Sequence, residues 1–484
     1  MKFAFAIILA TIVATGISAA TIKIHTQQDF DLLSETIANA IDKGANDISV
    51  DILAKELTFD NNQIFLKGIK RKDVSISIHG KGVHIMSQGQ YVDKVNSPDF
   101  MYLENSNYYN PWTEFQQLQD TIAIINYPAH RCRIYTPHRN KKDSAPQNKF
   151  INYTCWYTSR TSPITEIGKR FVDFDGGDWA IAQTPRRLNV NMDYSYAKIY
   201  PRYRLFGFKK ASGRIYECTA SNLLNLAFCD LKSFSIDSIH VKGSSNKGAL
   251  IFINHCTAES ISVSGSSFQC IGGTVLLDRK STNVCFAANK VDTFMGIGIH
   301  SEVESTGAKV IGNIFSNCSL SMEQGFAIQM RSDGFLVKDN TISDFCYGGI
   351  GVGIWAGSKT DSKCSGEVSG NELFYTSTFL DNLSQYTLMD SGAIYTWTRC
   401  HGIIIRHNHI HDISGIKDNR GIFCDDGTKN VTITNNWIER IHNSYDIDLR
   451  WCDTFKEMVP DHNTGNLILN NNTKGTVRFE TPKR

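Results

Sequence analysis

The sequence carries almost no net charge. Its 50 lysines and arginines are balanced by 48 aspartates and glutamates, which leaves a formal charge of +2. A chain this close to neutral has no field over its whole surface to concentrate nucleic acid, so we expect no nucleic-acid partner. Charged residues make up only 20% of the chain, whereas apolar residues make up 41%. This balance excludes global disorder and allows a large core.

Long apolar segments are lacking after the first twenty residues, so we expect no later segment to span a membrane. Residues 1–20 have the features of a secretory signal, with Lys2 at the start, an apolar run over Phe3–Val13 and small residues at Ser18–Ala20. The apolar run is shorter than the ~20 residues of a transmembrane helix, and a short anchor is the alternative. We expect cleavage before Thr21 and a secreted, periplasmic or extracellular protein.

Cysteine motifs for metals are lacking as well. The 13 cysteines lie between Cys132 and Cys452, without a CxxC pair and without a Cys-His spacing of the zinc type. Their number is odd, so at least one thiol is free or pairs with another chain, although export would permit disulfides. We interpret most of them as small, buried apolar side chains.

Repetition is the strongest signal that the sequence does contain. An Asn followed by β-branched or apolar positions recurs at intervals of 24, 27, 31, 37 and 28 residues, and a second short alternating strand lies between successive copies. Short strands without intervening helices predict a coil whose rungs pair in parallel, ~4.8 Å apart. Asn fits the corner of each rung, because it tolerates left-handed backbone and its amide can bond to the next rung. The repeated residues are Asn289, Asn313, Asn340, Asn371, Asn408 and Asn436.

Two segments depart from the repeat. Residues 28–41 have helical spacing, with five apolar residues on one face, and this helix would cap the open end of the coil. Residues 88–214, rich in Tyr, Trp and Arg, are interpreted as an inserted β-rich subdomain. The predicted divisions are a signal peptide at 1–20, the cap and first rungs at 21–87, the insertion at 88–214 and the main coil at 215–484.

On these repeats the chain resembles the right-handed parallel β-helix proteins of the pectin-lyase-like superfamily, over about 22–85 and 215–480. The resemblance implies an all-β, right-handed parallel β-helix with an N-terminal capping helix and an inserted β-rich subdomain. That superfamily includes lyases, hydrolases, epimerases and non-enzymatic adhesins, so the fold alone does not decide the function.

The second strand of each rung predicts an outer face suited to sugars. If Ile394 and Thr396 point into the coil, the residues that alternate with them point outward, and the same holds in neighbouring rungs. Flat aromatic rings suit sugar faces, while Arg binds hydroxyls or carboxylates. The expected substrate-binding residues on this face are Trp355, Tyr395, Trp397, Arg331 and Arg450.

Four aspartates near these strands are candidate catalytic residues: Asp390, Asp425, Asp426 and Asp448. Glycosidic hydrolysis needs two carboxyl groups ~5–9 Å apart, one as the acid and one as the base or nucleophile. Crowding would raise the pKa of one carboxyl and keep it protonated near neutrality. Ordinary turn formation is the alternative, since Asp-Gly is a common β-turn pair.

The segments Asp390–Trp397, Asn408–Asp412 and Gly421–Gly427 are similar to a pattern in secreted bacterial β-helix glycoside hydrolases, some of which act on α-fucosides or xylans. This resemblance implies that Asp390 and either Asp425 or Asp426 are catalytic candidates, without deciding which one is the acid. The Gly-His-Gly and Arg-Ile-Lys motifs of polygalacturonases are absent, and so is the Arg-Pro signature of pectate lyases. Galacturonan is therefore a less favoured substrate.

Histidines cluster close to the Asn408 corner. His407, His409 and His411 would face one way in an extended strand and could then bind zinc, but the corner inside the run should splay them apart. We therefore expect no metal site, and we interpret His411 and Asp412 as a hydrogen-bonded pair at the corner.

The sequence thus predicts a secreted carbohydrate-active enzyme, a glycoside hydrolase that needs no cofactor and acts on a polysaccharide or glycan. One alternative is a polysaccharide lyase that cuts uronate chains by β-elimination, with His411, Arg331 and Arg450 as candidates for the base and for binding the uronate. Calcium is possible in that case, although no calcium-loop motif is present. The other alternative is a non-catalytic glycan-binding or adhesive β-helix.

Overall fold

The structure is a computed structural model of the 484-residue chain. It describes residues 19–93, 102–103, 123–124, 133–134, 155–156, 179–190, 197–211, 214–245, 248–294, 296–319, 325–345, 347–355, 362–377, 391–414, 419–425, 428–442, 445–450 and 466–479.

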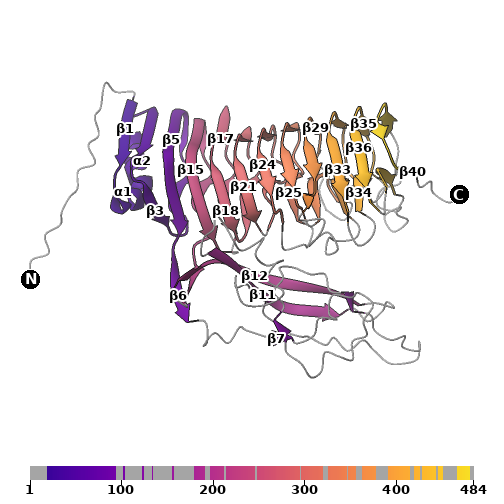
Figure 1. The fold of residues 1–484 in the computed structure, drawn as a ribbon. Helices are drawn as coiled ribbons and strands as arrows, with labels where there is room; N and C mark the ends of the chain where they lie inside the picture. Colours follow the sequence, from indigo (N-terminus) through magenta and orange to yellow (C-terminus); the bar gives the residue numbers. More distant parts are fainter. Residues whose placement is uncertain are drawn as a thin grey trace, which may run out of the picture.

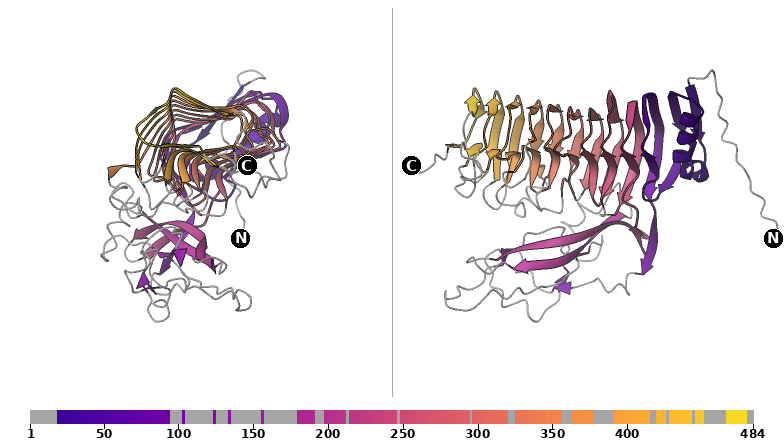
Figure 2. Two further views of the ribbon diagram at one scale, coloured as in Figure 1. Left: turned by 90° about the vertical axis from the view of Figure 1, so that its right-hand side faces the viewer. Right: turned by 180° about the vertical axis from the view of Figure 1, so that it is seen from behind.

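The chain forms a parallel β-helix, as the repeats predicted. From β16 onward each full rung contributes three short strands, and every strand of the coil pairs in parallel with its counterparts in the adjacent rungs (Figure 1). The view along the coil shows the rungs lying over one another (Figure 2).

One side of the coil is an eleven-stranded sheet, here called the eleven-strand sheet. It consists of β4 (Ile64–Lys67), β14 (Leu224–Ala227), β16 (Ala249–Asn254), β19 (Thr274–Arg279), β22 (Ile299–Ser301), β25 (Phe326–Met330), β28 (Gly348–Val352), β31 (Ser391–Thr396), β34 (Asn419–Cys424), β37 (Ile447–Leu449) and β40 (Val477–Phe479).

The rest of the coil is a 21-stranded sheet that bends at a corner into two runs, because β5 and β15 continue through the bend. The first run contains β1 (Ala19–Ile24), β2 (Asp47–Ile52), β5 (Lys70–Ser87), β15 (Asp230–Ser244), β17 (Ser260–Ser264), β20 (Val284–Ala287), β23 (Lys309–Ile311), β26 (Phe335–Lys338), β29 (Gly366–Ser369), β32 (Ile403–Arg406), β35 (Val431–Thr434) and β38 (Leu467–Leu469). The second run contains β3 (Glu56–Phe59), the later parts of β5 and β15, β18 (Ser267–Ile271), β21 (Lys290–Phe294), β24 (Ile314–Ser316), β27 (Thr341–Ser343), β30 (Glu372–Phe374), β33 (His409–Ile413), β36 (Trp437–Ile441) and β39 (Asn472–Thr473).

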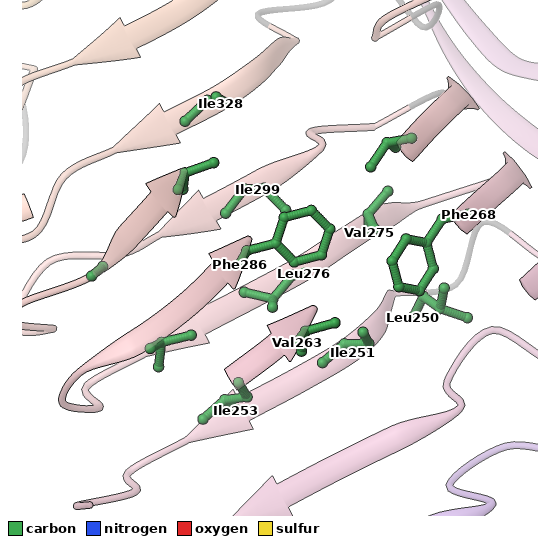
Figure 3. Packing of buried hydrophobic residues seen from close by; sticks show 14 of the residues in the cluster. Leu250, Ile251, Ile253, Val263, Phe268, Val275, Leu276, Phe286, Ile299 and Ile328 are labelled. Atoms are coloured by element: carbon green, nitrogen blue, oxygen red, sulfur yellow. The ribbon is translucent and has the colours of Figure 1, made fainter. Parts of the chain in front are cut away.

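The core lies inside the coil and is built from columns of aliphatic and aromatic side chains. In one column of the eleven-strand sheet, Ile251, Leu276, Ile299 and Ile328 occupy the same register on successive strands (Figure 3). The residues predicted to point inward are all buried; they are Ile328, Met330, Val352, Ile354, Ile394, Thr396, Ile422, Cys424, Ile447 and Leu449.

The asparagine ladder at the corner between the two runs is confirmed. Asn340 shows the pattern: its Nδ2 donates to Asn371 Oδ1 at 2.9 Å and to the Val310 carbonyl at 2.9 Å, while its Oδ1 accepts from Asn313 Nδ2 at 2.9 Å. The six predicted asparagines all take part, and Asn471 extends the ladder by one rung.

The expectation that the corner asparagines themselves adopt left-handed backbone is wrong. The left-handed backbone falls on the residue before each ladder asparagine, for example Ala288 at φ 54°, His407 at φ 54° and Asn470 at φ 54°. The ladder asparagines are required for their amides, which satisfy buried backbone and side-chain groups of two neighbouring rungs.

The predicted N-terminal helix is present as two helices, α1 (Gln27–Asp31) and α2 (Leu33–Asp42). Thr26 begins α1 with a capping box, in which its side chain accepts from the Asp29 backbone and the Asp29 side chain accepts from the Thr26 backbone. The five apolar residues predicted to share a face are buried against the end of the coil; they are Phe30, Leu33, Ile37, Ala40 and Ile41.

Strands between residues 89 and 218 form separate antiparallel sheets (Figure 1). Six of them make one sheet: β6 (Gly89–Asp93), β9 (Arg133–Ile134), β10 (Cys155–Trp156), β11 (Trp179–Val190), β12 (Ala197–Ala211) and β13 (Arg214–Cys218). The short strands β7 (Tyr102–Leu103) and β8 (Ala123–Ile124) pair with each other. The division of the chain at residues 88 and 214 stays a prediction.

Most described cysteines are buried, as the sequence predicted. Of the nine whose side chains the structure describes, eight are buried and Cys285 is half-buried. Burial raises the pKa of Cys364 and of Cys424 to about 12, so both thiols stay neutral and act as small apolar side chains. Among the described residues, no helix is long and apolar enough to cross a membrane.

Candidate active site

The predicted outer face of the eleven-strand sheet exists as a row of residues in register. Successive strands place Gln329, Gly351, Tyr395, Phe423 and Asp448 side by side, and Arg478 continues the row. The residues just beyond the strand ends continue the backbone hydrogen bonding of these rungs; they include Arg331, Trp397, Asp425 and Arg450. The residues expected to share one face of the sheet are thus neighbours in successive rungs.

The face is not the open platform that the sequence suggested. Tyr395 is 3% exposed, Asp425 7% and Asp448 0%. A layer of aromatic rings lies on the sheet, where the Tyr395 ring packs against Phe326 and Trp397 with centroids 5.8 and 5.1 Å away. Trp355, at 45% exposed, is the predicted aromatic that remains open to solvent.

Gly351 makes this aromatic layer possible. A Cβ at this position would lie 2.9 Å from an atom of Phe326 and 2.9 Å from an atom of Trp397. Any side chain there would push the two rings off the sheet, so the absence of a Cβ lets them close over β28.

Tyr395 and Asp425 form a buried pair. The Tyr395 hydroxyl donates a hydrogen bond to Asp425 Oδ2. A hydroxyl that donates to a carboxylate stabilises its ionised form, which is the state required of a nucleophile or a general base. Of the two candidate aspartates that the structure describes, Asp425 is the one whose carboxylate accepts a hydrogen bond from a neutral hydroxyl.

Asp448 has a different setting, which argues against the catalytic role predicted for it. Its Oδ2 accepts from Arg420 Nε at 2.6 Å and from Arg478 Nη2 at 2.7 Å, while its Oδ1 accepts from Arg478 Nε at 2.7 Å. Arg450 Nη2 lies 3.9 Å from the same carboxylate. A fully buried carboxylate among guanidinium groups holds these groups in place and has no open route to a substrate.

Arginines also lie on the aromatic layer. The guanidinium carbon of Arg420 is 3.9 Å from the Phe423 ring centroid, and that of Arg450 is 5.2 Å from it. Arg450 keeps about a quarter of its side chain exposed, whereas Arg420 is fully buried. The predicted residue Arg450 is therefore the one of this pair that can reach a ligand.

Sequence reasoning missed a charged group further along the same face. Arg279 binds Glu302 through two hydrogen bonds of 2.6 and 3.1 Å, and the charge of Arg331 acts on Glu302 and on His300. Burial lowers the pKa of His300 to about 4, so this imidazole is neutral at physiological pH. The outward alternation of β22 could have revealed His300, which shares a register position with Gln329.

A second unpredicted feature lies on the outer side of the second run. A groove of about 1100 Å³ follows β5, β15, β18 and β21. Glu56, His84, His240, Ser267 and Lys290 succeed one another in register along its floor. Burial, followed by the charge of His84, lowers the pKa of His240.

The predicted binding residue His411 lies on this same side, away from the eleven-strand sheet. It belongs to β33, and its Nδ1 is 2.7 Å from Asp412 Oδ2, which confirms the predicted pair. The corner separates His407 from the other histidines, as predicted, but His409 and His411 share one side of the strand and meet Glu372 of β30. Asp390 and Asp426 lie outside the described residues.

Comparison with known proteins adds little to this picture. No protein-family model matches the chain, and no curated protein sequence matches it. A solved structure described as a glycoside hydrolase is similar over 93% of this chain and 94% of its own, with 11% identity and a TM-score of 0.48. So distant a similarity does not establish a shared activity.

Proposed function

We propose that the protein is a carbohydrate-active enzyme that hydrolyses glycosidic bonds in a polysaccharide or glycan, with Asp425 as one of its catalytic carboxylates. The observation that carries this proposal is the hydrogen bond from the Tyr395 hydroxyl to Asp425 at the edge of an aromatic layer. Asp425 thus has a neutral hydroxyl donor, whereas Asp448 is bound by arginines.

Hydrolysis requires a second carboxyl group. Asp390, one residue before β31, and Asp426, next to Asp425, are the candidates that the sequence supplies. With Asp425 ionised, the second group would protonate the leaving oxygen. A separation of about 5–5.5 Å between the two carboxyl groups gives retention of configuration, and about 6.5–9.5 Å gives inversion.

The substrate would lie over the C-terminal half of the eleven-strand sheet. Trp355 offers an exposed indole for a sugar face, and Arg450 offers a partly exposed guanidinium for hydroxyl or carboxylate groups. We also propose that residues 1–20 direct export, which would bring the enzyme to extracellular or periplasmic glycans.

A polysaccharide lyase is the second candidate, and the excess of arginine favours it. Arg420, Arg450 and Arg478 surround the single carboxylate of Asp448, and such a positive site suits an anionic uronate chain. His411, the base considered for this reaction, lies on the outer side of another sheet, so a lyase would need a different base.

A glycan-binding or adhesive protein is the third candidate, and it would use the same exposed aromatic and arginine without turnover.

The test is an incubation of the mature protein with a panel of neutral and anionic glycans, in which reducing ends and ultraviolet absorbance are followed together. New reducing ends without absorbance support hydrolysis, because a lyase product is unsaturated and absorbs.

Asp425→Asn should abolish turnover while the protein stays folded. Asp237→Asn is the matched control, because this half-buried carboxylate pairs with His79 on the first run. Binding without turnover would support the adhesive alternative.

A further inference from the structure

Three side chains on the outer side of the second run converge on one point. Glu372 of β30 and His409 of β33 share a register position, and His411 lies two residues further along β33. His411 Nε2 is 3.4 Å from Glu372 Oε1, and His409 Nδ1 is 3.9 Å from the same oxygen. One ligand atom from each of the three residues lies within 4.8 Å of the others.

These separations fit an ion between the side chains better than direct hydrogen bonds. A hydrogen bond between an imidazole and a carboxylate is ordinarily ~2.7–3.2 Å long, which is shorter than either distance. Ligands ~2.0–2.2 Å from a tetrahedral zinc ion are ~3.4 Å apart. The pair His411–Glu372 already has this spacing, and the distance from His409 Nδ1 to Glu372 Oε1 exceeds it by about 0.5 Å.

Neighbouring groups hold the imidazoles in orientation. His411 Nδ1 is 2.7 Å from Asp412 Oδ2, and Asp412 is fixed by Arg440 through hydrogen bonds of 2.7 and 2.9 Å. A carboxylate on the far nitrogen of a histidine is the usual outer partner of a metal-bound imidazole. The His409 ring stacks on Trp437 with centroids 4.4 Å apart.

His409 adds an independent observation. Its Nε2 is buried, and no hydrogen-bond partner satisfies it. The carboxylate oxygen Oε1 of Glu439, in the next rung, lies 3.6 Å from this nitrogen. This oxygen already accepts a hydrogen bond from Arg440 Nη1, so Glu439 stands beside the three converging side chains as a paired negative charge.

We propose that Glu372, His409 and His411 bind one divalent transition-metal ion of the zinc class. Two imidazole nitrogens and a carboxylate oxygen suit zinc and its neighbours, whereas calcium requires six to eight oxygen ligands. The ion would join two adjacent rungs on a side of the coil away from Asp425, so the site is independent of the proposed glycan hydrolysis. It also replaces the expectation, drawn from the sequence, that the chain binds no metal.

The test is calorimetric titration of Zn²⁺ into the full chain without a polyhistidine tag, with Ca²⁺ in a parallel titration and Co²⁺ as a visible probe. We expect one Zn²⁺ per chain, Co²⁺ absorption bands of a low-coordinate site, and no Ca²⁺ binding. His411→Ala and Glu372→Gln should each weaken Zn²⁺ binding by about 100-fold or more, and Asp412→Asn by about 10–100-fold.

His407→Asn is the matched control. This histidine lies two residues before His409, its side chain is exposed, and its φ of 54° is one that Asn adopts readily. The variant should bind Zn²⁺ as the unmodified chain does. Circular dichroism and the apo melting temperature verify that each variant is folded, and Glu372→Gln keeps the size and shape of a half-exposed side chain. The proposal would be overturned if the unmodified chain did not bind Zn²⁺. It would also be overturned if His411→Ala and Glu372→Gln bound Zn²⁺ as tightly as the unmodified chain.

Discussion

The Tyr395 hydroxyl donates a hydrogen bond to the carboxylate of Asp425, which lies just beyond the next strand of the eleven-strand sheet. Both side chains are nearly inaccessible, and the Tyr395 ring is also packed against Phe423 and Tyr347. The pair is therefore fixed before any substrate arrives, as a catalytic carboxylate should be.

Removal of the Tyr395 hydroxyl should reduce turnover more than it reduces substrate affinity. Tyr395→Phe keeps the ring in the aromatic layer but leaves Asp425 without this donor, at a cost of about 1–3 kcal/mol. If Asp425 acts in the transition state, kcat should fall by about 10–100-fold with KM nearly unchanged. Steady-state kinetics on the glycan identified in the panel measures both values. A normal kcat in a folded Tyr395→Phe protein would count against a catalytic Asp425.

Asp448 should prove structural. Asp448→Asn leaves the buried Arg420 without its countercharge, and we expect a loss of about 3 kcal/mol or more of unfolding free energy. Urea unfolding followed by circular dichroism measures the loss. Glu367→Gln, which removes a partly exposed ion pair with Arg406, should change stability by less than about 1 kcal/mol and is the control. Unchanged stability together with lost activity would return Asp448 to the catalytic candidates.

The ladder makes Asn340 a stability determinant. Asn340→Ala deletes hydrogen bonds to Val310, Asn313 and Asn371 and leaves buried polar groups unsatisfied in both neighbouring rungs. A loss of about 3 kcal/mol or more is expected in the urea experiment. Asn472→Ala, at an exposed position of the last second-run strand, should have little effect. Equal midpoints for the two variants would show that the ladder contributes nothing measurable.

Asp278 predicts an unusual pH dependence. Burial raises its pKa to about 7, although Ser301 and Ser305 lower it in part. Between pH ~4 and ~7 the unfolded chain releases this proton while the folded chain keeps it, so stability should fall as the pH rises through this range and level off above it. Asp278→Asn removes the effect.

A comparison of Asp278→Asn with the unmodified chain separates the contribution of Asp278 to stability from that of the other titrating groups. The variant should gain stability over the unmodified chain by up to about 4 kcal/mol at pH 8 and by almost nothing at pH 4. Unfolding midpoints of both proteins at a series of pH values test this. A difference that does not vary with pH would contradict the predicted protonation of Asp278.

The alternation of apolar and polar residues and the recurrence of asparagine in the sequence determined the coil and its interior. Period-two alternation sorts the side chains of each short strand into an inner and an outer set, so Ile394 and Ile422 could be placed in the core without knowledge of their neighbours. The amide of Asn340 can serve two rungs at once, and the recurrence of such asparagines reveals the corner. These properties belong to single residues and their immediate neighbours.

The chemistry of the outer faces was decided only by the tertiary structure. Alternation placed Tyr395 and Asp448 on the outer side of the sheet, but it could not show that aromatic rings and arginines bury them there. Glu372 and His411 meet although 39 residues separate them, because β30 and β33 pair in adjacent rungs. The exposure and the partners of an outer side chain depend on the residues that neighbour it in the adjacent rungs. Those neighbours are set by the register between rungs, which exists only once the coil has formed.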